Sequence, residues 1–348
     1  MNAGIHRLSA KAVWTAGCAL LALSFIAASA RGAYAISPFQ LWEMVGNFLL
    51  GNSTESPESL VFFNIRLPRL ILAVAAGGGL GLAGALMQGM FRNPLADPGL
   101  IGVSSGAALA AGITIVLGAS MFPDMPRKLG SWVLVLMAFG GGLTVTGIIY
   151  ALSQSAHGTR VGMMLLAGIA INALAGAGLG LLSFMASDEQ LRSLSFWLLG
   201  SLGGARWSAV WLVVAIIFIA ACAASVLARP LNAIALGEAQ ATLLGVDVEQ
   251  TKRVAIVVTA LAVGAVTATT GIIGFVGLVA PHCIRLIAGP DHRVVLPGSA
   301  LLGAALVLAA DATARTVAQP AELPLGVLTA FVGVPFFLIL LRQFKGRI

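Results

Sequence analysis

The chain has 348 residues, of which 59% are hydrophobic and 9% are charged, and its formal net charge is +7. Soluble domains average about 45–50% apolar and about 25% charged residues, so this composition excludes an ordinary soluble protein and indicates a membrane protein. The apolar runs reach about 20 residues and do not alternate, which predicts an all-α membrane protein and excludes a β-barrel of short alternating strands.

Ten apolar runs are candidates for membrane-spanning helices in a single domain, residues 1–348. They lie near residues 12–33, 65–90, 98–118, 130–152, 161–184, 207–228, 253–271, 275–288, 294–316 and 323–341. The first run follows basic residues and precedes Ala-Ser-Ala, a pattern that also fits a cleaved signal peptide. Its apolar stretch is longer than the about 7–15 residues usual in such signals, which favours a retained span.

The distribution of basic residues predicts the orientation of these spans. With ten spans, both termini lie on one side, and the loops of that side hold 12 of the 20 Lys and Arg residues. Cytoplasmic loops are enriched in Lys and Arg, so we expect both termini in the cytoplasm. The polar segment 229–253, between the sixth and seventh spans, lies on the same side.

The charged residues and cysteines do not indicate nucleic-acid binding or a metal site. Most Lys and Arg flank the apolar runs singly or in pairs, as membrane anchors do. The three cysteines Cys18, Cys222 and Cys283 lie singly in apolar runs, without a CxxC spacing. We therefore expect neither a disulfide nor a metal site.

A GxGxxG pattern at residues 79–84 lies inside an apolar run. The dinucleotide fingerprint needs a preceding strand, so we interpret these glycines as helix-packing positions. The chain contains no GxxxxGK[ST] motif, so any ATP that drives it must bind another subunit. His282 follows Pro281 in a span, and we expect it to be packed in the protein or to contact a substrate.

A weak internal repeat links the two halves of the chain. Gly99-Leu-Ile-Gly opens the third span and Gly271-Ile-Ile-Gly opens the eighth. These spans start on opposite sides of the membrane, as an inverted repeat of spans 2–5 and 7–10 requires. Chance similarity between Gly-rich apolar segments is the alternative.

The stretch 237–253 resembles part of a soluble helical protein, because five of its residues are charged. Residues 238–244 predict a short helix that ends at Gly245, and Asp247 with Gln250 predicts the capped start of a second helix. Ala239, Ala241, Leu243 and Leu244 give the first helix an apolar face with nothing to cover it, which indicates a partner.

Several stretches together resemble the permease subunits of type II ATP-binding-cassette importers, the FecCD/BtuC-like family, and they follow one another from about residue 60 to 342. They are Arg66-Leu-Pro-Arg69; Gln88 with Phe91 through Gly99; Leu191-Arg192 with Phe196-Trp197; Gly237 through Val246; Gly274 through His282; Ala310 through Arg315; and Glu322 through Gly326.

This resemblance implies two permease copies around a central pathway, two cytoplasmic ATPases and a periplasmic binding protein, in the bacterial inner membrane. It implies that this chain has no catalytic residue and binds no cofactor, because ATP and magnesium belong to the ATPase. The positions that match the family's ATPase-coupling element are Gly237, Glu238, Ala239, Leu244, Gly245 and Val246.

The resemblance also assigns roles to arginines on the predicted outer side. Arg66, Arg69 and Arg315 match positions that grip carboxylates of the binding protein. Two alternatives are that these arginines anchor spans at the headgroups, or that Arg315 pairs with Asp311 one helical turn earlier.

For the translocation pathway the resemblance points to both ends of the bundle. Arg192 matches a short helix that borders the entrance, where it would meet an anionic cargo unless it pairs with Asp188 or extends to the headgroups. Asn93, Leu95 and Thr159 match the inner gate.

Among importers of different cargoes, the amino-acid sequence of the matching stretches resembles haem importers most, followed by ferric siderophore importers and then vitamin B12 importers. An ion-coupled secondary transporter is the competing class, and it would need an intramembrane carboxylate, for which Asp311 is the main candidate.

Overall fold

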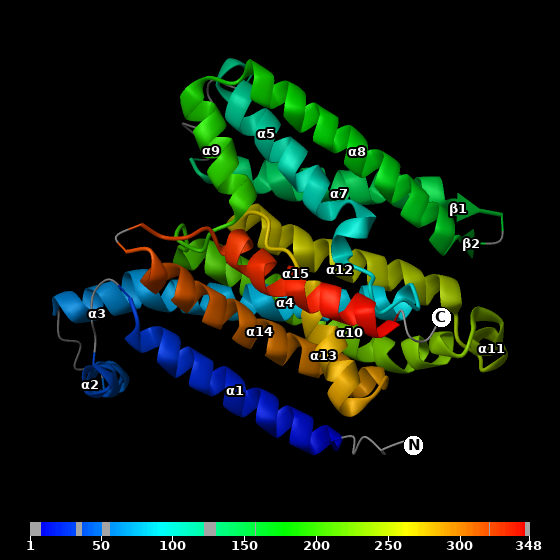
Figure 1. The fold of residues 1–348 in the computed structure, drawn as a ribbon, viewed down its shortest axis with the longest axis horizontal. Helices are drawn as coiled ribbons and strands as arrows, with labels where there is room; N and C mark the ends of the chain where they lie inside the picture. Colours follow the sequence, from blue (N-terminus) through cyan, green and yellow to red (C-terminus); the bar gives the residue numbers. More distant parts are fainter. Residues whose placement is uncertain are drawn as a thin grey trace.

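The computed structural model describes residues 8–32, 37–50, 56–121, 130–156, 158–319 and 321–344 (Figure 1). Its helices are α1 (Ala10–Ala30), α2 (Pro38–Leu49), α3 (Pro57–Val61), α4 (Leu67–Met90), α5 (Val103–Met121), α7 (Trp132–Ser153), α8 (Val161–Met185), α9 (Asp188–Leu199), α10 (Trp207–Ala235), α11 (Glu238–Leu243), α12 (Val248–Thr270), α13 (Val276–Ala288), α14 (His292–Val317) and α15 (Leu325–Phe344). Two antiparallel strands of two residues each, β1 (Gln154–Ser155) and β2 (Gly158–Thr159), form a hairpin. The predicted all-α class is confirmed.

The ten predicted apolar runs each fall on a helix. In the described part of the chain, seven helical stretches are long and apolar enough to cross a membrane, with α3 and α4 counted as one from Pro57 to Met90. The remaining three runs correspond to the shorter apolar helices α5, α13 and α15. A π-helical turn, Phe62–Arg66, joins α3 to α4 without a break. Such turns rotate the residues that follow them, and this one places Arg66 at the start of the buried part of α4.

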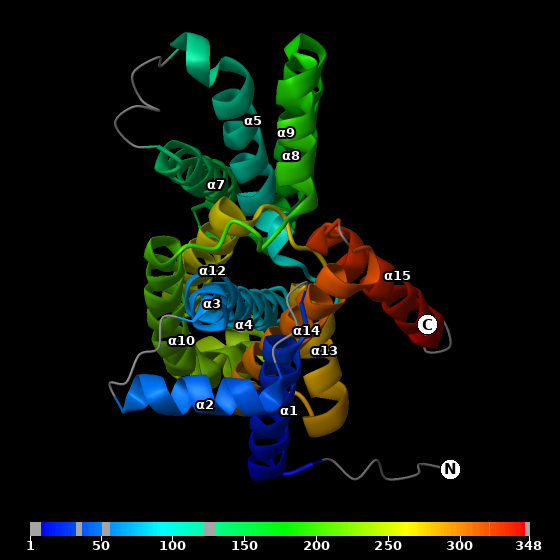
Figure 2. The ribbon, with the colours of Figure 1, turned by 90° about the vertical axis from the view of Figure 1, so that its left-hand side faces the viewer.

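Helix α4 is the central element of the bundle. It packs against α10, α12, α13 and α14, and most of its residues are buried. Helix α1 lies along α14 on the outside of the bundle (Figure 1). Helices α5, α7 and α8 form a second group, which meets the rest mainly through α12 (Figure 2).

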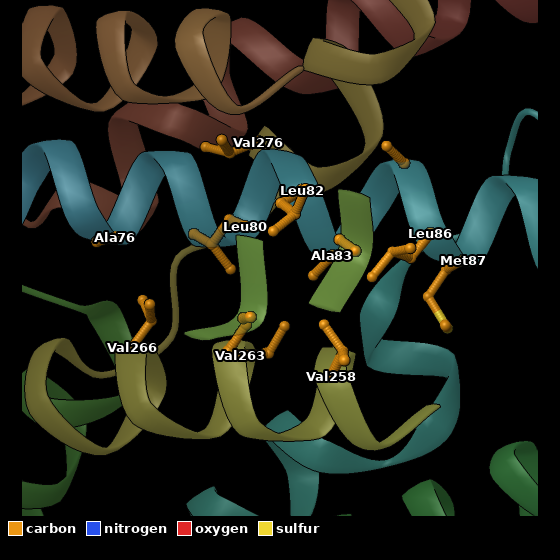
Figure 3. Packing of buried hydrophobic residues seen from close by; sticks show 14 of the residues in the cluster. Ala76, Leu80, Leu82, Ala83, Leu86, Met87, Val258, Val263, Val266 and Val276 are labelled. Carbon is orange, nitrogen blue, oxygen red and sulfur yellow. The ribbon is translucent and has the colours of Figure 1, made fainter. Parts of the chain in front are cut away.

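The core consists of aliphatic side chains at some contacts and of bare backbone at others. Leu80, Ala83 and Leu86 of α4 face Val258 and Val263 of α12 (Figure 3). On the α14 side, a side chain at Gly77 would collide with the carbonyl of Gly303, and one at Gly81 with the carbonyl of Ser299. The glycines of the GxGxxG segment therefore serve helix packing, as predicted, because lipid-embedded helices approach closely only where residues are small.

The helix contacts are consistent with an inverted repeat. The first helix of spans 2–5, α4, packs against α13 and α14, the second and third helices of spans 7–10. In the same way α12, the first helix of spans 7–10, packs against α5 and α7. The two matching Gly-rich segments are both non-α-helical: Pro98–Ile101 forms a 3-10 turn, and 271–275 forms no helix. Both segments end in left-handed backbone, at Gly102 and Phe275.

The segment between α1 and α4 contains an element that the sequence did not predict. Helix α2 buries Leu41 and Met44 and exposes Phe39 and Trp42. An amphipathic helix with exposed aromatic residues is suited to the membrane interface.

Helices α1 and α15 respectively begin and end at the end of the bundle that carries α11 (Figure 1). The terminal residues themselves, and the basic residues Arg7, Arg127, Lys128, Lys345 and Arg347 of the charge count, lie outside the described residues.

Candidate functional site

The predicted coupling segment 237–253 folds as two helical elements with glycine at both turns. Gly237 has φ +127°, and a side chain there would collide with Gln240, so the sharp turn from α10 into α11 requires glycine. At the other end Gly245 has φ +80°, and the amides of Gly245 and Val246 donate to the carbonyls of Thr242 and Ala241. This is the glycine-terminated helix end that the sequence predicts.

The second element differs from the expectation. Asp247 accepts a hydrogen bond from the Gln250 amide at 2.9 Å, so the cap is confirmed. The reciprocal capping box is instead formed at α9, between Ser187 and Gln190. The helix that Asp247 starts is not short: α12 runs unbroken from Val248 to Thr270, because no glycine or proline separates the polar turn from the apolar run. The predicted second coupling helix and the predicted seventh span are therefore one continuous helix, α12.

Helix α11 presents apolar side chains to the surface. Ala241 is buried, whereas Ala239 is exposed and Leu243 and Leu244 are 89% and 64% exposed. Leu236, at the end of α10, is also exposed. Exposed leucines on and beside a short helix are typical of a binding surface.

A buried lysine links α11 to the β1–β2 hairpin. The Lys252 side chain is only 4% exposed, and its Nζ lies 2.7 Å from Glu238 Oε1, on α11. The same Nζ donates to the carbonyl oxygen of Thr159 at 3.1 Å. A buried ammonium is stable only when it is paired and hydrogen-bonded, and Lys252 obtains both partners from different segments.

A carboxylate on the same helix holds the hairpin from the other side. Glu249 Oε2 accepts from the Thr159 amide at 2.8 Å, and Oε1 accepts from the Thr159 hydroxyl. Tyr150 completes the set through a longer contact of 3.4 Å to Glu249 Oε1. We call Glu238, Glu249, Lys252 and Thr159 the hairpin clamp. It fixes the predicted gate residue Thr159, which is buried, to α12 and α11.

The other two predicted gate residues lie in the connection between α4 and the 3-10 turn at Pro98. Asn93 is exposed, and its Oδ1 accepts from the Leu95 amide at 2.9 Å, a local turn that shapes the loop. Among the described residues, no hydrogen bond joins Asn93 or Leu95 to Thr159. The predicted gate residues thus lie in two separate segments: Asn93 and Leu95 after α4, and Thr159 in the β1–β2 hairpin.

The structure brings Arg66, Arg69 and Arg315 together at the opposite end of the bundle, and all three are buried. Arg69 Nε donates to Asp311 Oδ1 at 2.9 Å, and its two terminal nitrogens hold both Glu322 oxygens at 2.9 and 2.8 Å. Asp311 Oδ2 lies 3.0 Å from Arg315 Nε, so the predicted Asp311–Arg315 pair is present.

The remaining nitrogens of this arginine cluster hold the end of α1. Arg66 donates to the Ser29 carbonyl at 2.8 Å, and Arg315 donates to the carbonyls of Arg31 and Ala28 at 3.0 and 3.2 Å. The guanidinium groups thus stabilise contacts within the chain in this conformation. A docking role stays a prediction, and it requires a carboxylate to replace one that Arg69 already holds.

Glu322, which pairs with Arg69 of the arginine cluster, is accessible, because its side chain is 46% exposed. The hydrogen bonds from Arg69 hold the pKa of the Glu322 carboxyl below its ordinary value. Of the carboxylates that Arg69 contacts, it is the one that a partner's acidic group can displace, because Asp311 is buried.

Arg192 lies on α9, exposed beside exposed Leu191 and Phe196. The described residues contain no ion pair between Arg192 and Asp188. Its charge is therefore left open to solvent or to a visiting anion. His282, by contrast, is buried and packs edge-on against Phe336, at 6.2 Å between ring centroids.

Residues 20–343 match the FecCD transport family. The chain belongs to this family. It is similar to the hemin transport system permease protein HmuU of Yersinia pestis, with 45% identity over 330 residues that cover 94% of this chain and 95% of that protein. The cobalamin import system permease protein BtuC of Halobacterium salinarum is 41% identical, covering 81% and 73%.

A vitamin B12 import system permease protein of Klebsiella pneumoniae is 38% identical, covering 83% of this chain and 84% of that protein. Among solved structures, the chain is similar to an inward-facing ABC transporter described as of the metal-chelate type, with a TM-score of 0.81 and 28% identity. That match covers 96% of this chain and all of the other. The chain is therefore a multi-span membrane permease of the ABC importer class, a translocation subunit.

Proposed function

We propose that this chain is the permease subunit of an ATP-driven importer that moves haem from the periplasm to the cytoplasm by alternating access. The cargo assignment rests on the likeness to the Yersinia hemin permease, 45% identical over nearly the whole chain. The relatives named for cobalamin and vitamin B12 are 41% and 38% identical, so vitamin B12 is the second candidate cargo. Ferric siderophores are the third.

The assembly we propose has two copies of this chain, two cytoplasmic ATPase subunits that bind ATP and magnesium, and a periplasmic binding protein. The segment 229–253 supplies the ATPase contact, with the exposed leucines of α11 inserted into the ATPase surface. The end of the bundle that carries α11, where α1 begins and α15 ends, then faces the cytoplasm, in the bacterial inner membrane. Both termini are proposed to lie in the cytoplasm.

The observation that carries this proposal is the hairpin clamp. Lys252 bonds both Glu238 on α11 and the Thr159 carbonyl, so a displacement of α11 reaches the gate hairpin through one side chain. Glu249 adds a second connection, because α12 is a continuous rod from the coupling turn into the membrane. Closure of the ATPases would move α11 and the hairpin together, and Asn93 and Leu95 would complete the gate from the neighbouring loop.

At the periplasmic end, the arginine cluster is proposed to receive the binding protein. A glutamate of that protein takes the place of Glu322 on Arg69, so that docking exchanges one carboxylate for another. Exchange of this kind is compatible with rapid release, because the guanidinium is never left unpaired. Arg192 borders the entrance and offers a cation to the propionates of haem.

The buried charges disfavour the ion-coupled secondary transporter. Asp311 lies within 3.0 Å of both Arg69 and Arg315, so its negative charge is neutralised inside the protein. A carboxylate that couples proton or sodium movement must exchange its partner during the cycle. Asp311 has two fixed partners on α4 and α14.

The experiment is reconstitution of the permease with its ATPase in liposomes, with measurement of ATP hydrolysis upon addition of binding proteins loaded with haem, cobalamin or a ferric siderophore. We expect the greatest stimulation from the haem-loaded protein, with haem appearing inside the vesicles. Stimulation by the cobalamin-loaded protein alone would transfer the assignment to vitamin B12. Cargo uptake by the permease without any ATPase would overturn the importer mechanism.

A further inference from the structure

A polar cavity of about 260 Å³ lies at the α11 end of the bundle. It shares Asn93 with the predicted inner gate and contains none of the residues assigned to docking or coupling. This half-open cavity is lined by the last turns of α4, α10 and α13 and by the first turn of α14. Its polar walls come from Gln88, Arg92, Asn93, Arg285 and His292.

The Arg285 guanidinium faces this cavity with incomplete pairing. Its Nη2 donates to His292 Nε2 at 3.1 Å, and Nη1 makes a long 3.5 Å contact to the Pro290 carbonyl. Its Nε is buried and has no hydrogen-bond partner. Because His292 Nδ1 donates to Asn232 Oδ1 at 2.7 Å, Nε2 is the acceptor and the imidazole is neutral. His292 therefore orients Arg285 without altering its charge.

In the described part of the chain, no carboxylate forms an ion pair with the arginines of this cavity. The four ion pairs of the described residues include neither Arg285 nor Arg92. The adjacent acid, Asp291, is occupied by the Asn232 side-chain amide at 2.7 Å and the Arg293 backbone amide at 3.0 Å. Two guanidinium groups that line one cavity and form no ion pair there are typical of an anion-binding site.

The cavity also offers one acceptor. Gln88 Nε2 donates to the Leu278 carbonyl at 3.2 Å, whereas Gln88 Oε1 is buried and has no partner. Gly89 leaves room for the imidazole, because a side chain there would collide with His292 Nε2. The complementary ligand is an anion that carries a hydroxyl group, which donates to Gln88 while its other oxygens accept from the arginines.

We propose that this Arg285 cavity binds a phosphate group, supplied either by the headgroup of an anionic phospholipid such as phosphatidylglycerol or by free phosphate. The cavity lies where four membrane helices begin or end, which is the depth of lipid headgroups, and basic pockets between membrane helices bind anionic lipids in this position. The next residues of α13, Leu286 and Ile287, are exposed and apolar and provide a surface for an acyl chain. The proposal does not depend on which cargo the permease carries.

The test is native mass spectrometry of the purified full-length chain, titrated in neutral detergent with phosphatidylglycerol or, as a zwitterionic control, phosphatidylcholine. We expect one phosphatidylglycerol to bind with preference over phosphatidylcholine. Arg285→Gln is expected to weaken that binding at least about tenfold. Arg92→Gln, which removes an exposed side chain and spares the fold, is expected to cause a smaller loss. Arg293→Gln is the matched control, because Arg293 is exposed nearby and does not line the cavity.

A second arm measures thermal stabilisation by inorganic phosphate in the same four proteins. Stabilisation by phosphate that is lost in Arg285→Gln identifies free phosphate as the source, and binding of phosphatidylglycerol alone identifies lipid. Equal binding by wild type, Arg285→Gln and Arg92→Gln would overturn the proposal. Loss of ATPase assembly in Arg92→Gln, with no effect of lipid or phosphate, would also overturn it and would assign the cavity to a carboxylate of the ATPase.

Discussion

Lys252→Met tests whether the hairpin clamp is what fixes the gate hairpin to the coupling helix. Methionine keeps most of the apolar stem of Lys252 and removes the ammonium group. The substitution therefore abolishes the bonds to Glu238 and to the Thr159 carbonyl and leaves that carbonyl without its partner.

The expected cost follows from the exposure of the two partners. The Glu238 side chain is 48% exposed, so its pair with Lys252 counts as a surface ion pair, worth about 0.2–1 kcal/mol. The bond to the Thr159 carbonyl comes from a buried ammonium, and hydrogen bonds of charged groups contribute about 1.5–3 kcal/mol. Opening of the hairpin breaks only the second of these interactions, because Lys252 and Glu238 both lie outside the hairpin. The Thr159 bond therefore stabilises the closed hairpin by about 1.5–3 kcal/mol, and the lower value corresponds to opening about tenfold more often.

Hydrogen–deuterium exchange of the purified permease measures this opening directly. The reporters are the amides of Thr159, bonded to Glu249, and Arg160, bonded to Ser153. We expect peptides covering 150–161 to exchange about tenfold faster in Lys252→Met, and peptides of α14 to be unchanged. Arg229→Met is the control, because it removes the same charge from an exposed position at the end of α10. Unchanged hairpin exchange in Lys252→Met, or equal acceleration in α14, would refute the reasoning.

Three further substitutions test other parts of the structure. Leu243→Asp places a charge in the exposed patch of α11 and is expected to abolish co-purification with the ATPase, whereas Gln250→Glu at an exposed neighbour retains it. Glu322→Gln loosens the hold on Arg69, so binding-protein affinity measured at low salt should rise; an unchanged affinity argues against exchange of carboxylates. The ion pair with Arg69 lowers the pKa of the Glu322 carboxyl from 4.5, so this pair stabilises the wild type above pH 4.5 and is lost as the pH falls through the lowered pKa. The melting temperature of the wild type should therefore fall in this acidic range, and that fall should be absent in Glu322→Gln. Gly81→Ala drives a methyl group into the Ser299 carbonyl and should cost about 1–3 kcal/mol, lowering the melting temperature, whereas Gly140→Ala meets open space and should not.

Features encoded within a few residues were predictable from the sequence. The ten runs follow from hydropathy. The end of α11 follows from Gly245, and the start of α12 follows from the cap at Asp247. Each of these signals acts on its own turn of the chain, where backbone sterics and local hydrogen bonds decide the outcome.

Features that depend on distant partners were not predictable. Lys252 counted as one more basic anchor, because its partner Thr159 lies 93 positions away. Glu322 matched a family stretch without a role, since Arg69 lies 253 positions earlier. No local pattern distinguishes a solvated charge from one that the fold buries against a remote segment. The length of α12 was missed for a different reason: polarity marked a boundary where the backbone continues.

The contact between α4 and α14 sets which parts of the permease are able to move. At Gly77, Gly81 and Gly303 the two backbones touch without intervening side chains. Sliding of one helix past the other would first have to separate them, because no side chain there can change rotamer to accommodate a shift. The arginines at one end and the close glycine contacts along the two helices hold α4 and α14 together as one rigid unit. In the proposed alternating-access cycle, the reorientation then takes place where α12 meets α5 and α7, a contact made through ordinary, deformable side chains.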